Sequence, residues 1–154
     1  MRLNQRMPEA TIVSAILDIA APAAAIFELV ADPSQQPRWD GNDNLTEASA
    51  GQRVHAVGDV FTMTLTNGDV RENHVVEFDE GRLVAWQPSE PGSPRPGHLW
   101  RWQLEPLDES HTRVVHTYDW TRLTDEKRLV RARATTADKL QASLSRLAEL
   151  AEQR

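Results

Sequence analysis

Cysteine is absent from this chain of 154 residues. Without a thiol, the protein has no disulfide framework, no thiolate metal site and no cysteine nucleophile. Histidine is another side chain that commonly binds metals. We expect neither a metal nor a cofactor, because no compact ligand spacing joins the five histidines, which are His55, His74, His98, His111 and His116.

Long apolar runs and positive charge are scarce as well. The most apolar stretch, residues 16–31, is interrupted by Asp18, Pro22 and Glu28, which makes it unsuitable for crossing a membrane. The first nine residues lack the pattern of a signal peptide, so we expect a cytoplasmic protein without integral membrane contact. A net charge of −6 and a pI of about 5.3 disfavour nucleic acid as a partner, because phosphates attract basic surfaces.

The remaining composition is typical of a folded globular protein. Hydrophobic residues make up 40% of the chain and charged residues 26%. The length suits one core, and neither repeats nor linkers divide it. We therefore expect a single domain over residues 1–154, with a flexible N-terminus over residues 1–10. Association into a homodimer is compatible with this pattern.

The first part of the chain predicts a strand followed by two short helices. Residues 11–19 are rich in β-branched and apolar side chains, which favours a strand. Pro22 suits the first turn of a helix over residues 23–31, and Pro33 ends that helix. A second short helix is expected over residues 33–39.

Short antiparallel strands follow, and the clearest signal is a β-hairpin over residues 60–78. Asn67-Gly68 is typical of a two-residue type I′ turn. That turn sets three pairs on one inward face: Leu65 with Val70, Met63 with Glu72, and Phe61 with His74. The polar side chains of Glu72 and His74 are thereby predicted to point inward.

Three later strands, over residues 82–87, 98–104 and 113–121, predict an aromatic inner wall. The apolar side chains alternate with polar ones, so each strand presents its large rings on one face. A short connection between the last two strands places Trp102 opposite His116 and Trp100 opposite Tyr118. The predicted inner face carries Trp86, Trp100, Trp102, His116, Tyr118 and Trp120.

The end of the chain predicts one amphipathic helix of about thirty residues. Thr124 is a suitable N-cap, followed by two acidic residues. At 3.6 residues per turn, Arg133 falls on the apolar stripe formed by Leu129, Thr136, Leu140, Leu144, Leu147 and Ala151. The whole order of elements predicts an α+β fold in which a curved antiparallel sheet of about seven strands wraps around this helix.

Four local stretches carry a resemblance to a known superfamily. They are Ile16-Leu17-Asp18-Ile19-Ala20-Ala21-Pro22, Phe27-Glu28-Leu29-Val30-Ala31-Asp32-Pro33, Pro37-Arg38-Trp39-Asp40 and Thr112-Arg113-Val114-Val115-His116-Thr117-Tyr118. With the order of elements, they make residues 11–150 similar to the START/Bet v1-like superfamily, and within it to the polyketide cyclase/dehydrase-type branch. The resemblance implies a helix-grip fold with a cavity between sheet and helix that opens near the short helices and loops. It also implies that Trp39 sits where the family tends to place a tryptophan after the second short helix.

The predicted ligand-binding residues are those on the inner faces. The tryptophans provide rigid apolar surface for a small hydrophobic molecule, while His116, His74 and Tyr118 are the candidates for proton transfer or for orienting a carbonyl. Arg133 either pairs with Glu72, receives an acidic group of the ligand, or extends past the helix into solvent. The full predicted set is Trp86, Trp100, Trp102, His116, Tyr118, Trp120, Glu72, His74 and Arg133.

Three functions fit this pattern. The first is binding of a small hydrophobic, lipid-like or polyketide-like ligand in the internal cavity. The second is a polyketide cyclase/dehydrase-type enzyme that uses an inner-face histidine as general base, although no catalytic motif is evident. The third is an adaptor that regulates a chaperone or handles a quinone, with its outer surface as the working part.

Overall fold

The computed structural model describes residues 9–153, so the predicted flexible N-terminus lies outside the described residues except for Glu9 and Ala10. The elements in chain order are β1 (Ile12–Ile19), α1 (Ala23–Ala31), the 3-10 helix η1 (Pro33–Gln35), α2 (Gln36–Trp39), β2 (Leu45–Glu47), β3 (Val60–Leu65), β4 (Val70–Asp79), β5 (Leu83–Ser89), β6 (Leu99–Asp108), β7 (His111–Asp119), α3 (Glu126–Ala134) and α4 (Ala137–Glu152).

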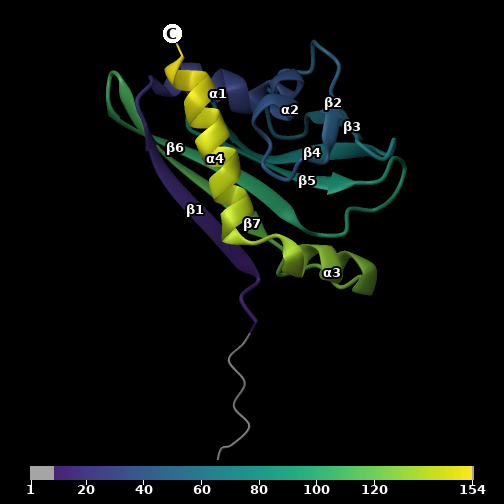
Figure 1. Cartoon of the computed structure of the whole chain (residues 1–154). Coiled ribbons are helices and arrows are strands. Elements are labelled where there is room, and N and C mark those ends of the chain that lie inside the picture. Colours follow the sequence, from purple (N-terminus) through teal and green to yellow (C-terminus); the bar gives the residue numbers. More distant parts are fainter. Residues whose placement is uncertain (1–8, 154) are drawn as a thin grey trace, which may run out of the picture.

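The strands form one antiparallel sheet of seven, in the order β1-β7-β6-β5-β4-β3-β2. Figure 1 shows this sheet curving around α4, with α1 and α2 near the C-terminal end of that helix and α3 near its beginning. The predicted α+β helix-grip fold is therefore confirmed.

The register of the β6–β7 pair also agrees with the sequence analysis. Trp100 lies opposite Tyr118, and Trp102 lies opposite His116. The large rings stand at every second position in both strands, and a shift of one residue would turn them to the outer face. The positions of the rings along these two strands are therefore enough to predict the aromatic wall.

The predicted turn of the β3–β4 hairpin is wrong by one residue. The loop has three residues, 66–68: the Leu65 amide donates to the Asp69 carbonyl at 2.7 Å, and the Gly68 amide donates to the Leu65 carbonyl at 2.9 Å. Gly68 has φ +91°, as in a type I turn followed by a bulge, and the Asn67 side chain accepts from the Asp69 amide at 2.9 Å.

This longer loop reverses the faces of β4. Met63 lies opposite Arg71, and Phe61 lies opposite Asn73. Because side chains alternate along a strand, the shift turns the predicted inward residues Glu72 and His74 to the opposite face. The inner face carries Arg71 and Asn73 instead.

The predicted single C-terminal helix is also wrong, because it breaks at Thr135 and Thr136. Both residues have extended backbone angles, with ψ of 90° and 167°. Two adjacent β-branched residues are weak helix formers, and the Thr135 hydroxyl donates to the carbonyl of Arg131 at 3.0 Å. The helix before the break, α3, is capped by Asp125 and not by the predicted Thr124. The Asp125 side chain accepts a hydrogen bond from the Lys127 amide at 2.9 Å.

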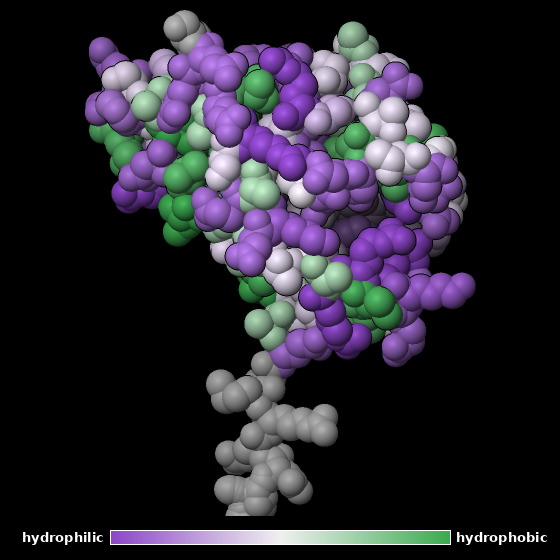
Figure 2. All heavy atoms as spheres, in the orientation of Figure 1, coloured by the Kyte–Doolittle hydropathy of each residue, from purple (hydrophilic) through white to green (hydrophobic). Residues whose placement is uncertain are grey.

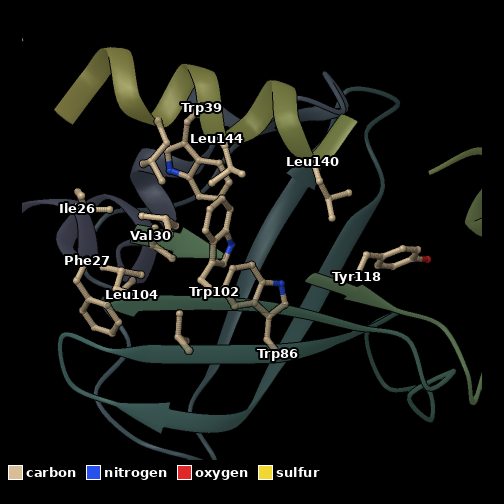
Figure 3. Packing of buried hydrophobic residues seen from close by; sticks show 14 of the residues in the cluster. Ile26, Phe27, Val30, Trp39, Trp86, Trp102, Leu104, Tyr118, Leu140 and Leu144 are labelled. Carbon is tan, nitrogen blue, oxygen red and sulfur yellow. The ribbon is translucent and has the colours of Figure 1, made fainter. Parts of the chain in front are cut away.

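The core lies between α1, α4 and the concave face of the sheet. Figure 3 shows leucines of α4 pointing toward rings from the sheet. The largest fully buried side chains include Trp39, Trp102, Phe27, Ile19, Ile26, Leu140, Leu144 and Leu147. Burial on this scale is the main force that holds helix and sheet together.

Candidate functional site

A cavity of about 190 Å³ lies between the sheet and the three helices α2, α3 and α4. In Figure 2 the surface is hollowed between α3 and the region of α2 and β2, and hydrophilic side chains surround the hollow. Aromatic rings line its interior: Trp39, Trp86, Trp100, Trp102, His116 and Tyr118. Buried polar side chains share the lining with the rings, among them Gln36, Asp40 and Asn73.

The rings form a continuous packed series. The imidazole of His116 stacks on Trp102 with 3.7 Å between ring centroids, and Trp39 meets the same indole edge-on at 5.0 Å. Trp100 packs against Tyr118 at 4.2 Å. Figure 3 shows Trp39, Trp102 and Trp86 following one another from α4 toward the sheet, with Tyr118 set apart on β7. A flat apolar molecule therefore meets rigid ring surface in this space.

The lining also includes residues with buried polar atoms that have no partner in the protein. Among residues 9–153, the buried side-chain atoms without a hydrogen bond are Gln36 Oε1, Asp40 Oδ2, His98 Nδ1 and Trp102 Nε1. All four residues line this cavity. Leaving a buried polar group unpaired costs about 1–3 kcal/mol, so native proteins tolerate few of them. Their concentration in one place is typical of a binding site.

His116 is held as a neutral hydrogen-bond acceptor. It is 3% exposed, and its Nδ1–H donates to the carbonyl of Arg101 at 3.1 Å. Burial lowers the pKa of His116 to about 3, so the ring carries no proton on Nε2 at neutral pH. This ring accepts hydrogen bonds readily but is a weak general base.

Two further titratable groups share the cavity with His116. Burial, together with the charges of Arg128, Arg71 and Arg131, lowers the pKa of His98 to about 4. Burial raises the pKa of Tyr118 to about 12, so its hydroxyl keeps its proton. Both groups are therefore neutral at physiological pH.

Asp40 is the carboxyl group of the cavity. It follows α2 and is 7% exposed, and its Oδ1 accepts from the side chain of Asn42 at 3.3 Å while Oδ2 has no partner. Burial raises the pKa of Asp40 above its ordinary value, against the hydrogen bonds from Asn42 and Asn44. A carboxyl with a raised pKa is suited to exchange protons with a bound molecule.

The structure brings together five of the residues predicted for the site. Trp86, Trp100, Trp102, His116 and Tyr118 all line the cavity. They come from strands whose alternation is unambiguous, which is why their common face was predictable. Their role in ligand binding stays a prediction.

The other four predicted residues lie elsewhere. Glu72 accepts weakly from the Gly92 amide at 3.4 Å, and His74 Nε2 is 3.1 Å from Ser89 Oγ, on the face away from the cavity. Trp120 is buried but borders a separate, more open hollow, where the Arg133 guanidinium lies 5.9 Å from its ring centroid.

Arg133 itself neither pairs with Glu72 nor enters the cavity. Its Nε donates to Glu9 at 2.7 Å. The sequence analysis drew one apolar stripe through a single helix. Because the helix breaks before α4, that stripe does not continue from α4 into α3, and Arg133 does not face the cavity.

Several cavity residues were not among those predicted. His98 carried a usable signal, because period-two alternation sets it on the same face as Trp100 and Trp102. Arg71 follows from the corrected hairpin register. Asp40 and Gln36 had no such signal, since a four-residue helix has no apolar periodicity of its own.

Residues 9–153 contain neither a helix suited to span a membrane nor a cluster of metal ligands. No helix there combines the length and apolarity that crossing a bilayer requires. In the same part of the chain, no three metal-binding side chains gather in one place.

Comparison with known proteins agrees with this architecture. An uncharacterised protein of Mycobacterium tuberculosis is 34% identical over 111 residues, which are 70% of this chain and 47% of that protein. This chain thus spans about half the length of the curated relatives that it matches.

Two solved structures share the fold at low sequence identity. The Zhui aromatase/cyclase from Streptomyces sp. R1128 superimposes with a TM-score of 0.67 at 18% identity, over 93% of this chain and 94% of that one. The Aha1 dimer from Colwellia psychrerythraea gives 0.65 at 19% identity, over 94% and 98%. Identities this low establish the shape and leave the chemistry to the site.

A family assignment rests on the sequence match itself. Residues 10–152, which include every strand and helix described above, match the family described as polyketide cyclase / dehydrase and lipid transport. The chain belongs to this polyketide cyclase/dehydrase and lipid transport family.

Proposed function

We propose that this protein binds a small, largely apolar molecule, aromatic or lipid-like, in the cavity between the sheet and α4. The observation that carries the proposal is the coincidence of two features in one place. The four residues that carry a buried, unpartnered polar side-chain atom among residues 9–153 all line this ring-lined space. A ligand with an apolar body and a few polar groups satisfies both features.

The size of the cavity supports a modest ligand. Its volume of about 190 Å³ exceeds the roughly 150 Å³ of an engineered cavity that takes up benzene. One or two rings, or a short acyl chain, match this space. Stacking against Trp100 or edge contact with Trp86 supplies affinity beyond simple burial.

Binding is tested with 2-naphthol as a neutral probe. We expect it to raise the Tm and to titrate with a measurable Kd by calorimetry, and native mass spectrometry of the purified protein is expected to show a retained lipophilic mass. Trp100→Leu should weaken naphthol about tenfold, because the loss of one aromatic contact is worth roughly 1 kcal/mol or more. Trp120→Leu is the matched control, since this tryptophan lies outside the cavity.

An empty mass spectrum together with no thermal shift across a panel of lipophilic compounds would contradict the binding function. Equal weakening of naphthol by both tryptophan substitutions would point to a general loss of packing instead of a ligand contact.

A second candidate, a cyclase/dehydrase-type enzyme, is favoured by Asp40. As a carboxylate, Asp40 would take a proton from a carbon next to a ketone of the substrate. The resulting enolate attacks a second carbonyl carbon of the same substrate molecule. The protonated carboxyl of Asp40 then returns its proton to the new alkoxide. His116 suits this base role less well, because its pKa of about 3 makes it a weak proton acceptor.

This enzyme hypothesis predicts that turnover of a polyketide-like substrate collapses in Asp40→Asn. The matched control is Asp43→Asn, an exposed carboxylate that is paired with Arg146. Full activity of Asp40→Asn would remove the proposed base, and equal losses in both variants would deny Asp40 a special role.

A further inference from the structure

The charge of the cavity differs in sign from the charge of the chain. The net charge is −6, yet the lining contains three permanently basic side chains and one carboxyl group. The basic residues are Arg71 on β4, Arg131 on α3 and Lys139 on α4, and the acid is Asp40. Three separate elements thus bring positive charge to one opening.

These three cations have no ion-pair partner among residues 9–153. Arg71 donates only to the carbonyl of its neighbour Val70, at 3.2 Å. Six other arginines form salt bridges: Arg53, Arg101, Arg113, Arg128, Arg133 and Arg146. Positive charge at the opening therefore remains available to a ligand.

The break in the C-terminal helix is what brings Arg131 to the cavity. Residues 135 and 136 are extended, so α3 leaves the line of α4 (Figure 1). Arg131 then lines the cavity, while Arg133, two residues later on the same helix, turns away and pairs with Glu9. The two arginines are a natural pair for comparison.

Two of the three cations act on titratable side chains of the lining. Besides burial, Arg71 and Arg131 both contribute to the low pKa of His98, and the charge of Arg131 acts against the burial that raises the pKa of Tyr118. For Asp40, burial raises the pKa, and the neighbouring charge that adds to this is the carboxylate of Asp43. Arg71 and Arg131 therefore lie near His98, whereas Lys139 belongs to the part of α4 whose backbone approaches Gly41, next to Asp40.

We propose that the ligand bound in this cavity is a carboxylic acid whose apolar body lies against the tryptophans and whose carboxylate is held at the opening by Arg131, with Arg71 and Lys139. The proposal rests on the binding function above and adds the chemical class of the ligand. A guanidinium pairs with a carboxylate through two parallel N–H donors, a geometry that a neutral amide cannot match. Arg131 and Lys139 are exposed to water and Arg71 is half-buried, which limits the gain.

The test compares two ligands of nearly identical shape, 2-naphthoate and 2-naphthamide, by isothermal titration calorimetry. We expect the carboxylate to bind the unmodified protein about tenfold more tightly than the amide at low salt. The preference should shrink as salt rises, because the opening is accessible to counterions. Arg131→Gln should reduce the preference at least about threefold with little change in amide affinity, whereas Arg133→Gln should keep it.

The outcomes separate this inference from the binding function. Equal affinities for both ligands, or tighter binding of the amide, would overturn the carboxylate preference and leave the cavity as a binding site. The assigned residues would be overturned if the preference for the carboxylate stayed as strong as in the unmodified protein. This applies both to Arg131→Gln and to the triple variant Arg71→Gln, Arg131→Gln, Lys139→Gln. Failure of either compound to bind would contradict the binding function, and the inference would fall with it.

Discussion

The interior of this protein has a filled half and an open half, built from the same sheet. In the filled half, under α1, Ile26, Phe27 and Val30 meet Leu104 of β6 and Leu144 of α4 (Figure 3). None of these five side chains lines the cavity. The open half, between α2, α3 and the later part of the sheet, contains the cavity and its unpartnered polar atoms.

The difference in packing indicates that the filled half mainly stabilises the fold, while the open half is available for binding. Close packing in the filled half gains dispersion and burial energy without polar cost. The open half gives up part of that energy, and strained or unsatisfied sites of this kind cluster where proteins bind or react. Mutations and pH changes are therefore expected to act differently on the two halves.

The largest expected effect is acid destabilisation from the open half. His98 and His116 have folded pKa values of about 4 and about 3, both below the ordinary 6.5. Below pH 6.5 the unfolded chain binds protons that the folded protein cannot, so stability present at neutral pH is lost as pH falls toward these values. We expect the free energy of unfolding to drop by roughly 4 kcal/mol between pH 7 and pH 5, measured by urea denaturation.

The histidines can be tested one at a time. His98→Gln should flatten this pH dependence, and substitution of the exposed His55 by Gln should leave it as it is. An unchanged slope in His98→Gln would mean that this ring is not kept neutral in the folded protein.

The second effect concerns the filled half. Leu144→Ala removes a side chain that is 0% exposed and should lower the free energy of unfolding by about 3 kcal/mol. Met63→Ala, on the wall of the cavity, should cost less, because part of the methionine surface already faces open space. Equal losses for the two variants in chemical denaturation would refute the division into halves.

The third effect arises where the two halves meet. A Cβ added at Gly41 would lie 2.6 Å from the carbonyl oxygen of Lys139 and 2.7 Å from the amide nitrogen of Ser143. Both are backbone atoms, so Gly41→Ala should push the end of α2 away from α4 at a cost of about 2 kcal/mol. In Gly41→Ala, both the affinity for naphthol and the Tm should fall. Unchanged values of both would show that the α4 backbone moves aside for the added methyl group at little cost.

The smallest expected effect is a gain. The folded pKa of Asp40 is raised, so its contribution to stability is present at low pH and is lost as pH rises through the folded pKa. Asp40→Asn should therefore be slightly more stable than the unmodified protein at pH 8, and the difference should vanish in acid. A variant that is less stable at pH 8 would show that ionised Asp40 supports the fold.

Local patterns predicted the fold and the aromatic wall because each was supported by several independent residues. In β6 and β7, the rings stand at alternate positions, and the observed register sets them on one common face. The hairpin turn was less constrained, since Asn-Gly is compatible with a two-residue or a three-residue loop. A single extra loop residue then exchanged Glu72 and His74 for Arg71 and Asn73 on the inner face.

The sequence by itself determined the helix-grip architecture, because the order of elements and their apolar periods act over short distances along the chain. Only the tertiary structure decided what surrounds the cavity. The helix break that turns Arg131 inward, the burial that raises the pKa of Asp40, and the four polar atoms without partners all depend on residues far apart in sequence. Burial and electrostatic environment are properties of packed neighbours, and a linear pattern does not contain them.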